Sequence, residues 1–97
     1  MMRPEEQIDV LVDVAVEEGV AVGAPWHVIL FNDEIHAFDE VVLQVMKATN
    51  CTMRKAAEVT LEAHHSGQAG AHSGDIGDCV RVQAVLSEIG LQTELRG

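Results

Sequence analysis

The segment WHVILFNDE, residues 26–34, is the most informative part of this sequence. Its first six residues, 26–31, are mostly apolar and include β-branched side chains. The last three, Asn32, Asp33 and Glu34, are polar residues of the kind that form turns. A short apolar run that ends at turn formers is typical of a buried strand. The segment therefore predicts a buried strand that ends at three adjacent side-chain oxygen acceptors.

The residues after this turn have the spacing of amphipathic helices. Apolar side chains recur at intervals of three and four from Phe38, which predicts a helix that frays near Thr49. Thr52 is a suitable N-cap for a second helix, and Gly67 is a suitable stop for it. A third helix is predicted after Asp75. The expected buried stripe of the second helix is Met53, Ala56, Ala57, Thr60, Leu61 and His64. The expected buried side of the third is Cys79, Val82, Leu86 and Ile89.

Two further strands complete the predicted fold. Residues 68–73 are a weak strand candidate because they contain two alanines and a glycine. Residues 91–95 alternate apolar or β-branched with polar side chains, as a half-buried strand does. The predicted order is β-α-α-β-α-β, a small α+β sandwich with a three-stranded sheet and helices on one face. Residues 25–97 are expected to form this single domain, and residues 1–24 a flexible, acidic N-terminal extension.

Length and charge exclude several classes of function. The chain has 97 residues, which is the size of one domain. Its 6 Lys and Arg residues against 16 Asp and Glu residues give a net charge of −10. Such a chain repels phosphate backbones and anionic lipid, so we expect neither nucleic-acid binding nor membrane binding. We see no apolar run long enough to span a bilayer and no secretory signal. The two cysteines form no CxxC motif, so a reducing cytoplasm is the expected location.

Three kinds of chemistry are open at this point. The acceptors of residues 32–34 suit an ammonium group or a metal ion, although composition alone favours a plain Asx turn. A zinc site would need scattered ligands to converge without a local signature, and we expect no metal. Its candidate ligands would be the pair His64-His65 with His36, His72 and Cys79. A thiol enzyme could combine a cysteine with His64. The residues of that combination would be Cys51 or Cys79, His64 and Asp33.

The order of these motifs resembles the ClpS family, adaptors that deliver N-degron substrates to a Clp AAA+ protease. The resemblance covers about residues 25–96. It is carried by VILFNDE, by FDEVV, by Ala63-His64 with Gly67, and by Gly90-Leu91. It implies a fold similar to the C-terminal domain of the ribosomal stalk protein. It also implies a binding protein that is not an enzyme, needs no cofactor, and has the N-terminal domain of a ClpA-like or ClpC-like unfoldase as its partner.

The resemblance further implies a site for a free protein N-terminus that starts with a bulky apolar residue. The residues matching the family's ammonium ligands are Asn32, Asp33 and His64. Those matching its side-chain pocket are Val41, Thr60, Ala63, Leu91, Phe38 and His36. An ammonium has three N–H donors, so an amide oxygen, a carboxylate and a neutral imidazole nitrogen can satisfy it. His36-Ala37 and Thr60 depart from common residues of the family, Thr-Pro or Asn-Thr and Met.

Two other functions remain open from sequence. One is a protein-interaction module of the same fold without an amine pocket. The other is the small His- and Cys-dependent enzyme described above. Binding of a Leu- or Phe-starting peptide, but not of its acetylated form, separates the adaptor from both.

Overall fold

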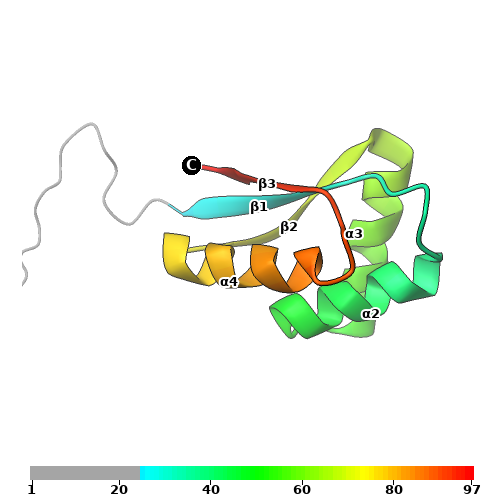
Figure 1. Cartoon of the computed structure of the whole chain (residues 1–97), viewed down its shortest axis with the longest axis horizontal. Helices are drawn as coiled ribbons and strands as arrows, with labels where there is room; N and C mark the ends of the chain where they lie inside the picture. Colours follow the sequence, from blue (N-terminus) through cyan, green and yellow to red (C-terminus); the bar gives the residue numbers. More distant parts are fainter. Residues whose placement is uncertain (1–24) are drawn as a thin grey trace, which may run out of the picture.

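The computed structural model describes residues 25–97, and the predicted extension over residues 1–24 lies outside the described part (Figure 1). The elements follow in the predicted order. They are β1 (Trp26–Phe31), α2 (Phe38–Thr49), α3 (Met53–Ser66), β2 (Gln68–Gly74), α4 (Ile76–Ser87) and β3 (Thr93–Arg96). The α+β prediction is therefore confirmed, including the weak strand candidate, which extends one residue further than predicted.

The sheet has the order β2-β1-β3, and β1 pairs antiparallel with both neighbours. Its central position explains the apolar composition of β1, because Val28 and Leu30 are fully buried. The pairing with β2 shifts register between Val28 and Ile29, which is a bulge of the kind that bends a strand. In Figure 1 the helices lie on one side of the sheet, and the C-terminus lies near the start of β1.

The ends of the helices follow the sequence signals. The hydroxyl of Thr52 caps α3 by accepting from the backbone N–H of Lys55 at 3.1 Å. Gly67 ends α3 in the left-handed region, with φ of 89°. The carboxylate of Asp75 caps α4 by accepting from the N–H of Asp78 at 2.8 Å. These caps fix where α3 stops and α4 starts, and so fix the length of the β2 segment between them.

The hydrophobic core fills the space between the sheet and the helices. Its most deeply buried side chains are Val28, Leu30, Val45, Ala56, Cys79, Val82 and Leu86. One part of the predicted core is wrong. Met53 and Leu61 of α3 are exposed, and Val59 is buried instead. His64 is also outside the core, as an exposed residue near the end of α3. The true stripe of α3 is Ala56, Val59, Thr60 and Ala63, which is rotated from the predicted one.

Among residues 25–97, no helix combines the length and the apolar character that crossing a bilayer would require.

Candidate functional site

The candidate site lies where β1 ends beside the end of α3. The backbone N–H of Asn32 donates to the carbonyl of Gly67 at 3.0 Å, and the N–H of Gly67 donates to the carbonyl of Ala63 at 2.9 Å. On the other side, the N–H of Phe31 donates to the carbonyl of Gln92 at 3.0 Å. These backbone bonds hold the end of β1 and the following turn between the last turn of α3 and the segment before β3.

A hollow of about 320 Å³ opens at this junction. Its polar lining comes from Asn32, Asp33, Glu34, His36, Thr60 and His64. Its apolar lining comes from Leu30, Phe31, Phe38, Val41 and Ala63. Ligand pockets start at about this size, and few polar groups on an apolar wall are typical of them. The hollow has room for one side chain and the backbone attached to it, not for a large cofactor.

The hollow brings together eight of the nine site residues expected from sequence. They are Asn32, Asp33, His36, Phe38, Val41, Thr60, Ala63 and His64. Leu91 is the exception, because it is only 4% exposed, packs in the core and does not line the hollow. Leu30 and Phe31 line the hollow but were missed, although their place at the end of a buried strand that leads into the turn was a usable signal. Glu34 was recognised in the acceptor turn but not assigned to the site.

Asn32 has a fixed orientation at the mouth of the hollow. Its side-chain Nδ2 donates to Oε2 of Glu34 at 2.7 Å. This bond uses the donor side of the amide and leaves the carbonyl oxygen Oδ1 as an acceptor. Glu34 therefore acts on the site by turning Asn32.

The carboxylate of Asp33 organises the loop between β1 and α2. Its Oδ1 accepts from the backbone N–H groups of Ile35 at 2.7 Å and of His36 at 2.6 Å. Its Oδ2 lies 2.9 Å from Nδ1 of the His36 ring. A carboxylate has about four lone-pair positions, so three contacts leave about one for a ligand. Asp33 is thus both the anchor of its own loop and a negative charge at the hollow.

The contact between Asp33 and His36 changes the pKa of both groups. Burial alone would raise the pKa of the Asp33 carboxyl, but the hydrogen bonds from His36 and Ile35 outweigh it and lower this pKa. The hydrogen bond to Asp33 raises the pKa of His36 above its ordinary value, against a smaller opposing effect of burial. Glu40 and the backbone carbonyl of Ile89 raise it further. The pair therefore favours a negative Asp33 and a protonated His36.

The far side of the hollow is apolar, with one hydroxyl. Val41 and Ala63 are buried, whereas Phe38 is 46% exposed at the rim. The Thr60 hydroxyl donates to the backbone carbonyl of Ala56 at 2.8 Å, so its proton is already satisfied within α3. His64 stands at the rim, with its ring centroid 5.6 Å from that of His65. An apolar side chain could lie between Phe38 and Val41, with the polar backbone of the same residue toward Asn32 and His64.

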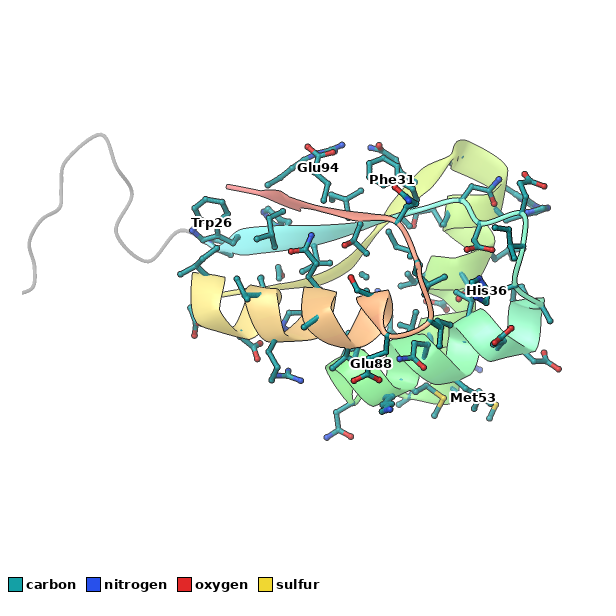
Figure 2. All side chains as sticks on the ribbon, in the orientation of Figure 1. Trp26, Phe31, His36, Met53, Glu88 and Glu94 are labelled. Carbon is teal, nitrogen blue, oxygen red and sulfur yellow. The ribbon has the colours of Figure 1, made fainter. Side chains whose placement is uncertain are left out.

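The structure does not bring a cysteine to this hollow. Cys79 is fully buried, with Sγ 3.5 Å from the carbonyl oxygen of Trp26 at the opposite end of β1. Burial raises the pKa of the Cys79 thiol, which disfavours a nucleophilic thiolate. Figure 2 shows Trp26 and His36 at opposite ends of the molecule. Cys79 therefore cannot serve as the nucleophile of His64.

Cys51 lines a second, shallower hollow of about 360 Å³. The other residues of that hollow are His27, Thr49, Lys55, Gly70, Ala71, His72 and Ser73. His72 is paired there with Asp78 at 2.5 Å. Within residues 25–97, no three His, Cys, Asp or Glu side chains are grouped closely enough to hold a metal ion. The scattered ligands considered for zinc do not converge in this part of the chain.

Comparison with known proteins gives a family match. The family model described as "ATP-dependent Clp protease adaptor protein ClpS" matches residues 23–93, which is well over half of the chain. The chain is 30% identical over 61 residues to the E3 ubiquitin-protein ligase UBR2 of Homo sapiens, covering 63% of this chain. It is 28% identical over 74 residues to the E3 ubiquitin-protein ligase UBR1 of Drosophila melanogaster, covering 76% of this chain. The chain spans about 4% of the length of these relatives.

Proposed function

This chain belongs to the ClpS family of protease adaptor proteins, and we propose that it binds proteins by a free, bulky apolar N-terminal residue. In this proposal it hands them to a Clp AAA+ unfoldase, ClpA-like or ClpC-like, through the N-terminal domain of that unfoldase. It catalyses no reaction itself. The observation that carries the proposal is the hollow in which Asn32, Asp33 and His64 line one cavity with Phe38 and Val41.

The polar residues of the hollow match the donors of an α-ammonium group. Oδ1 of Asn32, the remaining lone pair of Asp33 and a neutral ring nitrogen of His64 are the three acceptors. Hydrogen bonds that involve a charged group contribute about 1.5–3 kcal/mol each. Acetylation removes the charge and leaves a single N–H donor, so two acceptors lose their partner. The site is therefore expected to select free N-termini.

The apolar residues of the hollow account for the preference for a bulky first residue. Burying a Leu or Phe side chain contributes about 1.5–3 kcal/mol. Together with the ammonium contacts, and after the cost of association, we expect a binding free energy of about −8 kcal/mol. This value corresponds to a dissociation constant in the micromolar range. Thr60 is shorter than the Met of some family members, which leaves room for aromatic rings at this wall.

The relatives agree with a role in protein degradation. A protease adaptor and ubiquitin-protein ligases both belong to machinery that destroys selected proteins. The described domain, residues 25–97, is proposed to be the part that selects the substrate.

A peptide titration tests the binding step. A fluorescent peptide that starts with Leu is expected to bind the full chain with micromolar affinity, and its acetylated form at least tenfold more weakly. His64→Ala should weaken binding about tenfold through loss of one charge-assisted contact. His65→Ala is the matched control, because His65 is also exposed in the last turn of α3 but does not line the hollow. Equal binding of both peptides, or equal effects of both variants, contradicts the proposal.

A degradation assay tests the delivery step separately. A reporter protein that starts with Leu should be degraded faster by a ClpA-like or ClpC-like unfoldase with its peptidase when this chain is added. The same reporter with a Gly start should show no acceleration. If peptides bind but neither unfoldase accelerates degradation, the binding step stands and the delivery step is wrong.

A further inference from the structure

His36 contacts the carboxylate of Asp33, which the proposed ligand would also contact. The ring nitrogen Nδ1 lies 2.9 Å from Oδ2 of Asp33, and the backbone N–H of the same residue bonds to Oδ1. The two side chains are only 17% and 10% exposed, so solvent screens their contact weakly. Both residues line the hollow. Figure 2 shows His36 beside the connection between β1 and α2, close to the start of α2.

The charged groups around this ring are mostly negative. Asp33 and Glu34 come from the loop before it, and Glu40 comes from the first turn of α2. His64 of α3 lines the same hollow from the opposite wall. The segment after α4 contributes the backbone carbonyl of Ile89, which is uncharged. Without a ligand, Asp33, Glu40 and the Ile89 carbonyl favour the imidazolium form of His36, and the hydrogen bond to Asp33 is the largest contribution.

We propose that His36 is a positioning residue that makes ligand binding depend on pH, because its imidazolium form competes with the ligand's ammonium for the charge of Asp33. The inference rests on the proposed function above. When His36 is protonated, Asp33 is already neutralised by a cation, and the incoming ammonium meets a like charge. When His36 is neutral, Nδ1–H still donates to Oδ2 and keeps the loop in place. The carboxylate then carries its full charge toward the ligand.

Binding of an ammonium beside Asp33 expels the proton of His36, which leaves to the solvent. By linkage, a ligand that lowers the pKa of His36 by about one unit binds up to about tenfold more weakly when that site is protonated. Affinity should therefore rise with pH across the range in which His36 of the free protein titrates.

The test must separate His36 from two other titrating groups. The α-amino group of the peptide has an ordinary pKa of about 7.7–8.0, so measurements stay below about pH 7, where the peptide remains an ammonium. His64 is the second group, because its ring also lines the hollow. The variants His36→Asn and His64→Gln distinguish the two, since each replaces an imidazole with an amide that cannot titrate. An Asn at position 36 also retains an N–H donor that can reach Asp33.

The affinity of the full chain for the Leu-starting peptide is measured between about pH 5.5 and about pH 7. Wild type is expected to bind severalfold more weakly at the acid end than near pH 7, within the tenfold limit given above. His36→Asn should show an almost flat profile, and His64→Gln should bind more weakly but keep the slope. Calorimetry of wild type near pH 6, in two buffers of different ionisation heat, should show proton release on binding. This last measurement needs no variant to fold.

Each alternative result has a distinct meaning. A flat wild-type profile without proton release overturns the inference and leaves the proposed function intact. A slope that persists in His36→Asn but disappears in His64→Gln overturns it in favour of His64. Failure of the peptide to bind at any pH refutes the proposed function, and the inference with it.

Discussion

At the residue scale, the Asp33 carboxylate is used mostly by its own loop, which limits what it can offer to the proposed ligand. Three of its acceptor positions are already used by Ile35 and His36. Replacing Asp33 with Ala would therefore remove the loop anchor as well as the ligand contact. The exposed rim residue His64 separates these effects better, because it lies on α3, outside the loop that Asp33 anchors.

The stabilising effect of the Asp33–His36 contact should depend on pH. The raised pKa of His36 contributes stability that is complete below about pH 6.5, the unfolded value, and is lost as pH rises through the folded value. The lowered pKa of Asp33 contributes stability above about pH 3.8 that is lost as pH falls through its folded value. Both contributions are therefore present between about pH 4 and about pH 6.5.

We expect His36→Asn to lower the urea midpoint most at about pH 5 and less at about pH 8, because the stability that comes from a raised pKa is lost as pH rises. Urea unfolding of both proteins at the two pH values measures this difference. His65→Asn serves as the control, since His65 is an exposed histidine of α3 and lies outside the loop that contains Asp33 and His36. A midpoint difference that is the same at both pH values would show that the contact does not depend on charge.

At the element scale, the end of α3 determines where the site forms. Gly67 has φ of 89° and its carbonyl accepts from the N–H of Asn32. An L-residue in this backbone conformation costs about 1–2 kcal/mol. A β-carbon at position 67 would meet no atom within 4 Å, so strain is the only expected cost.

Gly67→Ala is therefore expected to reduce the free energy of unfolding by about 1–2 kcal/mol. Gly70→Ala in β2 is the matched control, because Gly70 also has open space but no positive φ. It should be neutral or slightly stabilising. Denaturant unfolding of the two variants checks both expectations, and equal losses at the two positions would contradict the role of the αL conformation.

The sequence predicted the positions of the helices and strands better than it predicted which face of α3 is buried. The caps Thr52, Gly67 and Asp75 and the run 26–31 set the boundaries of β1 and α3 and the start of α4 within about one residue, whereas α4 ends earlier than predicted, at Ser87, and β3 starts two residues later, at Thr93. The face of α3 was misjudged because Met53 and Leu61 are as apolar as Val59, and periodicity alone does not show which stripe meets the sheet. Packing against β2 and α2 decides that.

The sequence predicted most of the residues that line the hollow, but not the hydrogen bonds between them. The predicted strand and helix place Asn32 and Asp33 after a strand and His64 at a helix end. The resemblance to the ClpS family then implies that these three residues share one site. The contact of His36 with Asp33 depends on the conformation of the loop, which no periodicity encodes. Leu91 follows Gly90, which has φ of 83°, and packs in the core rather than lining the hollow.

At the scale of the whole molecule, the hollow and the buried Cys79 thiol lie at opposite ends of β1. The hollow lies at the end of β1, whereas the Cys79 thiol contacts the carbonyls of Trp26 and Gly74 at its start. Six residues of strand separate these ends by about 20 Å. A change at Cys79 should therefore affect stability without reaching the ligand.

Cys79→Ala removes one fully buried heavy atom and leaves a small cavity, which should cost about 1–2 kcal/mol of unfolding free energy. The affinity for the Leu-starting peptide should stay within about twofold of wild type, because the hollow keeps all its lining residues. Cys51→Ala, at a half-buried position in the second hollow, should cost less stability and also preserve binding. Loss of peptide binding in either folded variant would mean that a thiol takes part in the function, which is what the enzyme hypothesis requires and the adaptor hypothesis forbids.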